Sequence, residues 1–98
     1  MSHLEQADAI LLSAADNVAT VLRAVSAGEQ IAIRRGEQTS IIVARDAVPL
    51  CHKISLAEIP AGATVTKYGE PIGAASCPIA AGAHVHVHNM ISLRARRA

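Results

Sequence analysis

Hydrophobic positions in the first third of the chain form a short run and then a helix-like repeat. The apolar run at residues 9–13 is long enough for a buried strand and too short for a separate helix. Asp16 is a good N-cap and Gly28 a good terminating residue for a helix that lies between them. The apolar residues in this interval have the i, i+3, i+4, i+7 spacing of one helix face: Val18, Val21, Leu22 and Val25. The pattern predicts a strand followed by one short α-helix near the N-terminus.

The next hydrophobic positions predict β-structure. The β-branched segments 30–34 and 38–44 flank the turn residues 35–37, so they are predicted to form a hairpin. Pro49 lacks an N–H donor and cannot lie in a central strand, so it marks a connection to the segment 52–56. This part of the chain is predicted to be scaffold.

A seven-residue pattern recurs at residues 59–65 and 79–85, with a looser copy at 25–31. Each copy places a glycine three positions after a branched apolar residue, and another apolar residue three positions after the glycine. Because glycine accepts positive φ, each copy predicts a turn that is anchored in the core and begins a strand. The copies are too short and too irregular for a solenoid. The chain is therefore predicted to be mainly β, with short strands joined by glycine turns.

Composition narrows the class of protein. A chain of 98 residues has room for one core, so residues 1–98 are predicted to form a single domain, with the core at about 9–89 and a basic tail at 90–98. Tyr68 is the sole Phe, Tyr or Trp residue, so the core is aliphatic, and a partner that covers part of the apolar surface is an open alternative. A net charge of +1 argues against nucleic-acid binding. The arginines within 94–97 fit either a solvated end or an anion site.

The chain shows no targeting signal. No apolar run reaches the ~20 residues that a membrane helix needs, and the first residues lack a basic region followed by an apolar one. The protein is therefore expected to be cytoplasmic and free of membrane contact, with Cys51 and Cys77 as reduced thiols. Cys51 directly precedes His52, but neighbours in an extended segment face opposite ways, which disfavours a nucleophilic pair.

Histidine is concentrated near the end of the predicted core, where His84, His86 and His88 fall at every second position. On an extended strand these imidazoles point to one face, while Val85 and Val87 point to the other. Neutral imidazole binds metal ions and titrates near pH 7. A functional site is the favoured interpretation, and the inert polar face of an edge strand is the alternative.

Strand geometry limits how these histidines hold a metal ion. Alternate residues of a strand lie about 6–7 Å apart at Cα and residues four apart about 13 Å, whereas an imidazole nitrogen lies about 2.0–2.1 Å from a zinc-like ion. Two neighbours can share one ion, but three on a straight strand cannot. Another ligand is then needed from His52, Glu70, a substrate carboxylate or another chain, in a site that suits iron(II), manganese or zinc. The remaining histidine is a candidate acid, base or anion contact.

Other motifs accompany the histidines. Lys67-Tyr68-Gly69 is flanked by turn residues, and the pair His52-Lys53 precedes the glycine turn at Gly62. With the run from His84 to Asn89, these motifs resemble the small-subunit SAF domain of the altronate and galactarate dehydratase family, and the small subunit of sulfolactate sulfo-lyase is similar in the same way. Two departures are Cys51 and Ala83, which stand where that family has a glycine and an acidic residue.

The resemblance implies a fold and an activity. The fold is a mainly β, SAF-like β-clip of short strands with one short α-helix near the N-terminus. The activity is that of a lyase that eliminates water, or sulfite, from a hydroxylated carboxylic acid with the help of a divalent metal, Fe(II) in the first place and Mn or Zn otherwise. The partner is a separate large catalytic subunit, without which the chain is expected to be inactive.

The resemblance also implies roles for individual residues. Metal ligands are expected among His84, His86 and His88, and catalytic groups at His88 and Lys67. Contacts to substrate are expected from His52, Lys67, Tyr68 and Asn89. Three alternatives stay open: a plain hairpin turn with a half-buried tyrosine at Tyr68, a non-enzymatic module that binds carbohydrate or a partner, and a subunit whose histidines touch substrate rather than metal.

Overall fold

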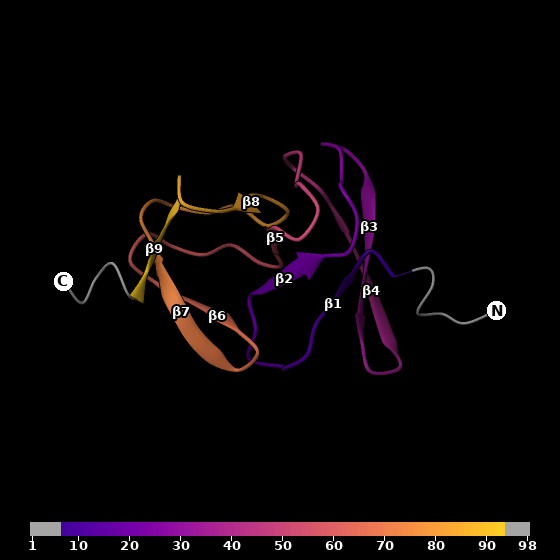
Figure 1. Ribbon diagram of the computed structural model, residues 1–98, viewed down its shortest axis with the longest axis horizontal. Helices are drawn as coiled ribbons and strands as arrows, with labels where there is room; N and C mark the ends of the chain where they lie inside the picture. Colours follow the sequence, from indigo (N-terminus) through magenta and orange to yellow (C-terminus); the bar gives the residue numbers. More distant parts are fainter. Residues whose placement is uncertain (1–6, 94–98) are drawn as a thin grey trace.

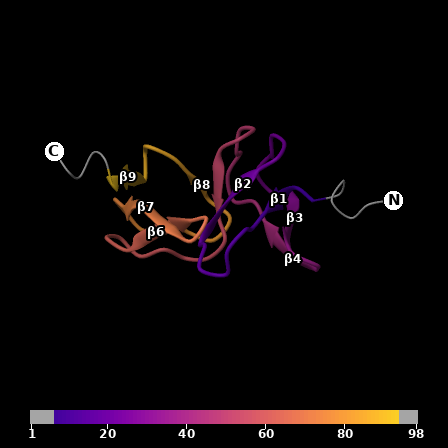
Figure 2. The same ribbon diagram turned by 60° about the horizontal axis from the view of Figure 1, so that its bottom comes forward.

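Two β-sheets account for the regular structure of this chain (Figure 1). The computed structural model describes residues 7–93. The larger sheet has the strand order β4 (Gln38–Val43), β3 (Gln30–Arg35), β1 (Ala9–Ile10), β2 (Val18–Val21), β5 (Lys53–Ser55) and β8 (His84–Val85). The smaller sheet has the order β6 (Thr64–Lys67), β7 (Glu70–Ala75) and β9 (Met90–Ser92). In Figures 1 and 2, β3 and β4 lie at one end of the molecule and the smaller sheet at the other, with β2, β5 and β8 between them.

Most of the predicted strands are confirmed. The apolar run at residues 9–13 contains β1, and the predicted hairpin is the antiparallel pair β3–β4, closed at Arg35 opposite Gln38. The segment after Pro49 contains β5. The mainly β fold predicted from the glycine turns is therefore correct.

The predicted helix between Asp16 and Gly28 is wrong, because its first part is strand β2. β2 lies between β1 and β5, and Val18, Ala19 and Val21 are all buried. A central strand that is covered on both faces has a nearly continuous apolar sequence instead of strict alternation, so its spacing can match one face of a helix. Asp16 does not cap a helix but accepts a hydrogen bond from the Gly69 backbone N–H at 2.7 Å.

Four similar corners join the strands and pair two by two. Val25 and Val48 exchange two backbone hydrogen bonds of 2.9 Å, and Ile59 and Ile79 exchange two of 2.8 Å. The side chains of all four are buried, so each corner is anchored in the core. The structure thus contains two similar units, each made of one pair of corners. The second unit consists of the corners at 59–65 and 79–85, which carry the repeated sequence pattern.

Each corner contains a residue with positive φ three positions after its buried anchor. Three of these residues are glycines, as the sequence pattern predicts: Gly28 at 92°, Gly62 at 84° and Gly82 at 84°. The fourth is Cys51, which has a φ of 71° and follows Val48 at the same spacing. The corner at Val48 is therefore a fourth copy of the pattern. It could not be recognised in the sequence because a cysteine stands in place of the glycine.

A short polar segment before β2 fastens the two sheets together. The Asn17 side chain donates to the Thr64 carbonyl oxygen at 2.9 Å and accepts from the Thr66 N–H at 2.8 Å. The Asn17 N–H also donates to the Thr66 carbonyl oxygen at 3.2 Å. Below this connection, Val18 and Val85 of the larger sheet pack with Val65 of the smaller one in a shared apolar cluster. The β6–β7 hairpin is therefore held firmly beside β2.

The ordered sheet continues beyond Asn89. β9 pairs with β7 through Met90 opposite Ala75, inside the segment that was expected to be tail. The arginines at 94, 96 and 97 lie outside the described residues. Within residues 7–93, no helix has the length and apolar character needed to cross a membrane.

Candidate functional site

The predicted histidine strand is shorter than expected. β8 ends at Val85, and the chain then turns, with the His86 carbonyl oxygen accepting from the Asn89 N–H at 3.1 Å and the Met90 N–H at 2.9 Å. Val85 is fully buried, as predicted, but Val87 is 80% exposed, so the expectation that both valines share one packed face is wrong for Val87.

Asn89 is the cause of this turn. Its Oδ1 accepts from the His86 N–H at 2.9 Å, and its Nδ2 donates to the His84 carbonyl oxygen at 2.8 Å. Asn89 itself is buried. The turn bends the histidine row back on itself, so that the rings of His84 and His88 lie 5.2 Å apart between centroids, far closer than on a straight strand.

A fourth histidine joins the row from the neighbouring strand. His52 directly precedes β5, which pairs with β8 through Lys53 opposite Val85. The His52 Nδ1 lies within hydrogen-bond distance of the His84 Nε2, at 2.9 Å, and the His52 ring stacks on that of His86 with centroids 4.3 Å apart. One ring nitrogen from each of these three residues lies within 4.8 Å of the others. The three form what we call the histidine cluster: His52, His84 and His86.

The surroundings of His84 and His86 favour uncharged imidazoles. Burial, and after it the neighbouring His52, lowers the pKa of both His84 and His86. Asp46 opposes this only at His84, where its carboxylate accepts from the backbone N–H at 3.0 Å. Neutral imidazole is the form that binds a metal ion, so these two shifts favour metal binding by His84 and His86.

The geometry of the cluster fits one metal ion. Two nitrogens that each bind the same ion at about 2.1 Å lie roughly 3 to 4 Å apart. The ring nitrogens of the cluster lie within 4.8 Å of one another, so small side-chain rotations would bring them to this separation. Three imidazoles on one side leave coordination positions open for oxygen ligands, as in iron(II), manganese and catalytic zinc sites. The cluster contains two of the three predicted ligands, His84 and His86, and adds His52.

The other predicted residues lie around the cluster or away from it. His88 contacts the His84 ring but is outside the group of three. Lys67 and Tyr68 close the β6–β7 hairpin, where the Lys67 Nζ lies 4.7 Å from the Tyr68 ring centroid and Tyr68 has a φ of 57°. Glu70 at the same turn is exposed and does not join the cluster.

Two residues that act on the cluster were not among the predicted site residues. Asp46 holds the start of β8 through the His84 N–H, and its only sequence signal is an acidic residue just before a predicted connection. Lys53 lowers the pKa of His86 through its charge, after burial and His52. Its position next to His52 in the sequence was the available signal.

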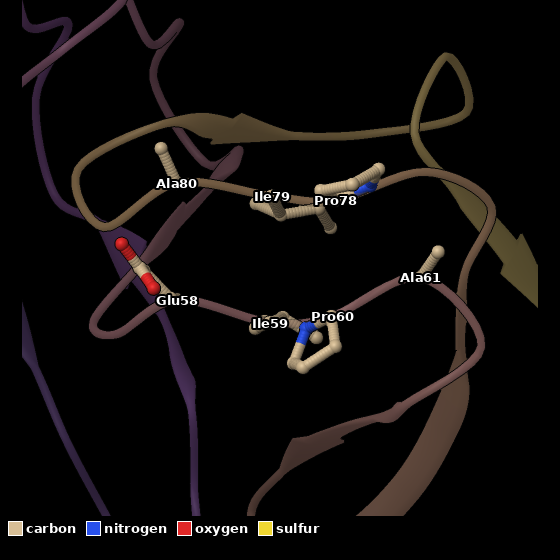
Figure 3. A pocket seen from close by; sticks show the side chains of 7 residues that line it. All are labelled: Glu58, Ile59, Pro60, Ala61, Pro78, Ile79 and Ala80. Carbon is tan, nitrogen blue, oxygen red and sulfur yellow. The ribbon is translucent and has the colours of Figure 1, made fainter.

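A separate apolar cavity of about 430 Å³ lies between the paired corners at Ile59 and Ile79 (Figure 3). The two segments run side by side in the picture, with Glu58 at one end and Ala61 at the other. No histidine lines this cavity. Because its walls carry a single ionisable group, Glu58, it lacks the chemistry that the histidine cluster offers.

Comparison with known proteins adds an independent line of evidence. Residues 7–93 match the model of a protein family described as the altronate/galactarate dehydratase SAF domain. The chain is 41% identical over 80 residues to altronate dehydratase of Escherichia coli K12, which covers 82% of this chain and 15% of that protein. It is 33% identical over 76 residues to the (2R)-sulfolactate sulfo-lyase subunit alpha of Chromohalobacter salexigens, which covers 76% of this chain and 81% of that subunit. The chain thus spans a small part of the first relative and most of the second.

Proposed function

Because the chain belongs to the family of altronate/galactarate dehydratase SAF domains, we propose that it is the small subunit of a metal-dependent lyase that removes water from a hydroxylated carboxylic acid. Metal dependence is proposed because ring nitrogens of His52, His84 and His86 lie within 4.8 Å of one another. The relatives' names support the reaction class and the larger partner, since one relative is a subunit and the other is several times longer. A cytoplasmic location stays part of the proposal.

The proposed roles follow from the positions of the side chains. His52, His84 and His86 hold a divalent metal, Fe(II) in the first place and Mn or Zn otherwise. When bound, this ion supplies Lewis-acid polarisation of the substrate's oxygen atoms. His88, beside His84 but outside the cluster, is the proposed proton donor or acceptor.

Residues outside the cluster complete the proposed site. Lys67 and Tyr68, which form the tip of the β6–β7 hairpin, contact the acid substrate, and Lys67 is also a candidate catalytic group. Asn89 positions the histidines, since both ends of its side-chain amide bind backbone groups of the histidine turn. A large subunit contributes the rest of the site.

A specific observation supports a second candidate. The chain matches 81% of the length of a sulfolactate sulfo-lyase subunit but only 15% of an altronate dehydratase. This match over most of a subunit's length therefore also suits a sulfo-lyase subunit, with sulfite in place of water as the leaving group.

Metal titration of the purified chain tests the proposal. We expect anaerobic calorimetry with Fe(II), and parallel runs with Mn(II) and Zn(II), to show one ion per chain. His52→Ala, His84→Ala and His86→Ala should each weaken binding at least tenfold, because each removes one ligand. Glu37→Ala, in the exposed turn between β3 and β4, is the control and should leave the affinity unchanged.

Lyase assays then separate the two reactions. The chain alone should show no turnover, and its complex with a large subunit should convert altronate or galactarate, or else release sulfite from sulfolactate. Absence of metal binding together with an active complex would leave the histidines as substrate contacts. If the chain binds no metal and its complex shows no lyase activity, the chain is a non-enzymatic binding module.

A further inference from the structure

Strand β4 forms one edge of the larger sheet, where, among the described residues, it pairs with β3 alone. Figures 1 and 2 show these two strands at the end of the molecule that lies away from the smaller sheet. The pairing runs in continuous register from Gln38 opposite Arg35 to Val43 opposite Gln30, without a bulge. The outer side of β4 is therefore a regular strand edge, of the kind to which another strand can add.

The backbone groups of Thr39 and Ile41 point out from this edge. In an antiparallel pair, successive residues direct their N–H and C=O groups alternately toward the neighbouring strand and away from it. Ala44 points toward the β3 side, because its N–H donates to the Glu29 carbonyl oxygen and its own carbonyl oxygen accepts from the Gly28 N–H, both at 2.8 Å. Counted back from Ala44, the odd-numbered residues of β4 point outward. Within residues 7–93, the outward backbone groups of Thr39 and Ile41 have no partner.

The chain around Gly82 closes one end of the free edge. The Arg45 N–H donates to the Gly82 carbonyl oxygen at 2.8 Å. The Val43 carbonyl oxygen lies so close to Gly82 that a Cβ at this glycine would collide with it. A strand that adds to β4 can therefore pair with Thr39 and Ile41 but cannot continue past Val43.

The side chains of β4 are those of a covered strand. Its sequence, QTSIIV, contains neither a charged residue nor a proline, although lysine, proline or a bulge usually protects an exposed strand edge. Ile42 packs against the core, whereas Ile41 and Val43 lie on the other face and are 59% and 56% exposed. Exposed apolar side chains and unpaired backbone groups therefore occur on the same strand.

This edge is complementary to itself. Antiparallel pairing about a two-fold axis at Ser40 sets Thr39 of one copy opposite Ile41 of the other, so that their outward N–H and C=O groups bind each other. Because β4 is uncharged, no like charges meet in this pair, and the two Ile41 side chains become diagonal neighbours. A register centred one residue later would run the second strand into the segment that already binds Arg45.

We propose that the free edge of β4 is a homodimer interface, at which β4 of a second copy adds antiparallel about Ser40 and joins the two larger sheets into one. β4 and β8 are the opposite edges of the larger sheet, so the dimer leaves the histidine cluster open. The interface is independent of the proposed metal site and lyase reaction. One pair of short strands buries less area than a standard interface, so we expect a dissociation constant of about 10–100 µM.

Sedimentation velocity of the full chain, from about 5 to about 500 µM under reducing conditions, tests the association. The mass should rise with concentration from that of one chain to that of two. Ile41→Lys places charges beside the two-fold axis and should weaken association at least tenfold. Val87→Lys replaces another exposed apolar side chain, on the histidine turn, and should leave association unchanged.

Thr39→Pro tests the backbone pairing. It removes an outward N–H that the chain's own sheet does not use, so it should abolish the dimer while circular dichroism shows an intact fold. In the wild type, the Thr39 and Ile41 amides should exchange slowly with solvent at about 500 µM and rapidly at about 5 µM.

Cysteine cross-linking tests the register, in a background with Cys51→Ser and Cys77→Ser. Ser40→Cys should form a disulfide-linked dimer on mild oxidation, because the axis brings the two Cα atoms about 4.5–5.5 Å apart. Gln38→Cys is the matched control and should not cross-link, because its two copies lie four residues out of register, about 13 Å apart along the strand.

Four results would overturn the proposal. A chain that stays monomeric up to about 500 µM does not use β4 to pair with itself. A dimer that survives both Ile41→Lys and Thr39→Pro has its interface elsewhere. Protection of the Thr39 and Ile41 amides at every concentration would mean that the chain covers its own edge, and protection only after a large subunit is added would assign the edge to that subunit. Metal titration would be unaffected by any of these results.

Discussion

Cys51 occupies a backbone conformation that the other three corners give to glycine. Positive φ costs a residue with a Cβ about 1–2 kcal/mol of steric strain. Glycine instead costs about 0.5–1 kcal/mol, because it loses more conformational entropy on folding. Cys51→Gly should therefore raise the free energy of unfolding by about 0.5–1 kcal/mol in urea denaturation under reducing conditions. Cys51→Ser keeps the Cβ and should change it by less than about 0.5 kcal/mol. Equal stability of both variants would contradict a strained corner.

Asn89 is a second residue whose role depends on local geometry. It is buried, and its amide bridges the His86 N–H and the His84 carbonyl oxygen. Asn89→Ala should lower the free energy of unfolding by about 2 kcal/mol, since two backbone groups lose their partners. Metal affinity should fall as well, because the histidine turn loosens. Asn89→Asp keeps the acceptor for the His86 N–H, so its stability and its metal affinity should lie between those of wild type and Asn89→Ala. An unchanged metal affinity in Asn89→Ala would show that the turn does not position the histidines.

At the scale of elements, the corners were predictable and β2 was not. A glycine three positions after a branched apolar residue defines a turn through local sterics, so the corners at Gly62 and Gly82 follow from a few adjacent residues. Strand β2 is decided by its pairing with β1 and β5 along its two edges and by the core that buries Val18, Ala19 and Val21. The sequence pattern of residues 18–21 does not contain these long-range contacts. Long-range pairing therefore overrode the apparent helix period.

In the histidine site, too, some features follow from the local sequence and others depend on contacts made only in the folded chain. The sequence shows His84 and His86 on one strand face, and simple distances require an outside ligand such as His52. The bend that returns His88 toward His84 depends on the Asn89 side chain and could not be predicted from alternation. The approach of His52 to His84 depends on the pairing of β5 with β8, which joins residues more than thirty positions apart.

Corner glycines differ in how much space surrounds them. A Cβ at Gly62 would meet nothing within 4 Å, whereas a Cβ at Gly82 would collide with the Val43 carbonyl oxygen. Gly62→Ala should cost about 1–2 kcal/mol from backbone strain alone. Gly82→Ala should cost clearly more, because the corner must also separate from β4. Thermal unfolding of the two variants measures the difference, and equal costs would exclude the backbone contact as a constraint.

For the whole molecule, the lowered pKa values of His84 and His86 make folding sensitive to acid. Groups that charge less readily in the folded state than in the unfolded chain bind fewer protons when folded, so stability is highest above the ordinary histidine pKa of 6.5 and falls as the pH drops through the folded pKa. The metal-free protein should have a higher urea midpoint at pH 7.5 than at pH 5.5. His84→Gln should reduce this difference, and a midpoint that is independent of pH would contradict the assigned shifts.

At the scale of the whole molecule, the outer surface also bears on where the proposed large subunit would bind. Val87 is 80% exposed on the histidine turn. Ile41, which is 59% exposed, lies on β4 at the opposite end of the molecule (Figure 1). Since a partner that completes the histidine site must cover the turn, Val87→Asp should weaken co-purification with a large subunit at least tenfold, while Ile41→Asp should leave it intact. Both substitutions are on the surface and should leave the isolated chain folded; loss of the complex with Ile41→Asp alone would place the partner on β4 and away from the histidines.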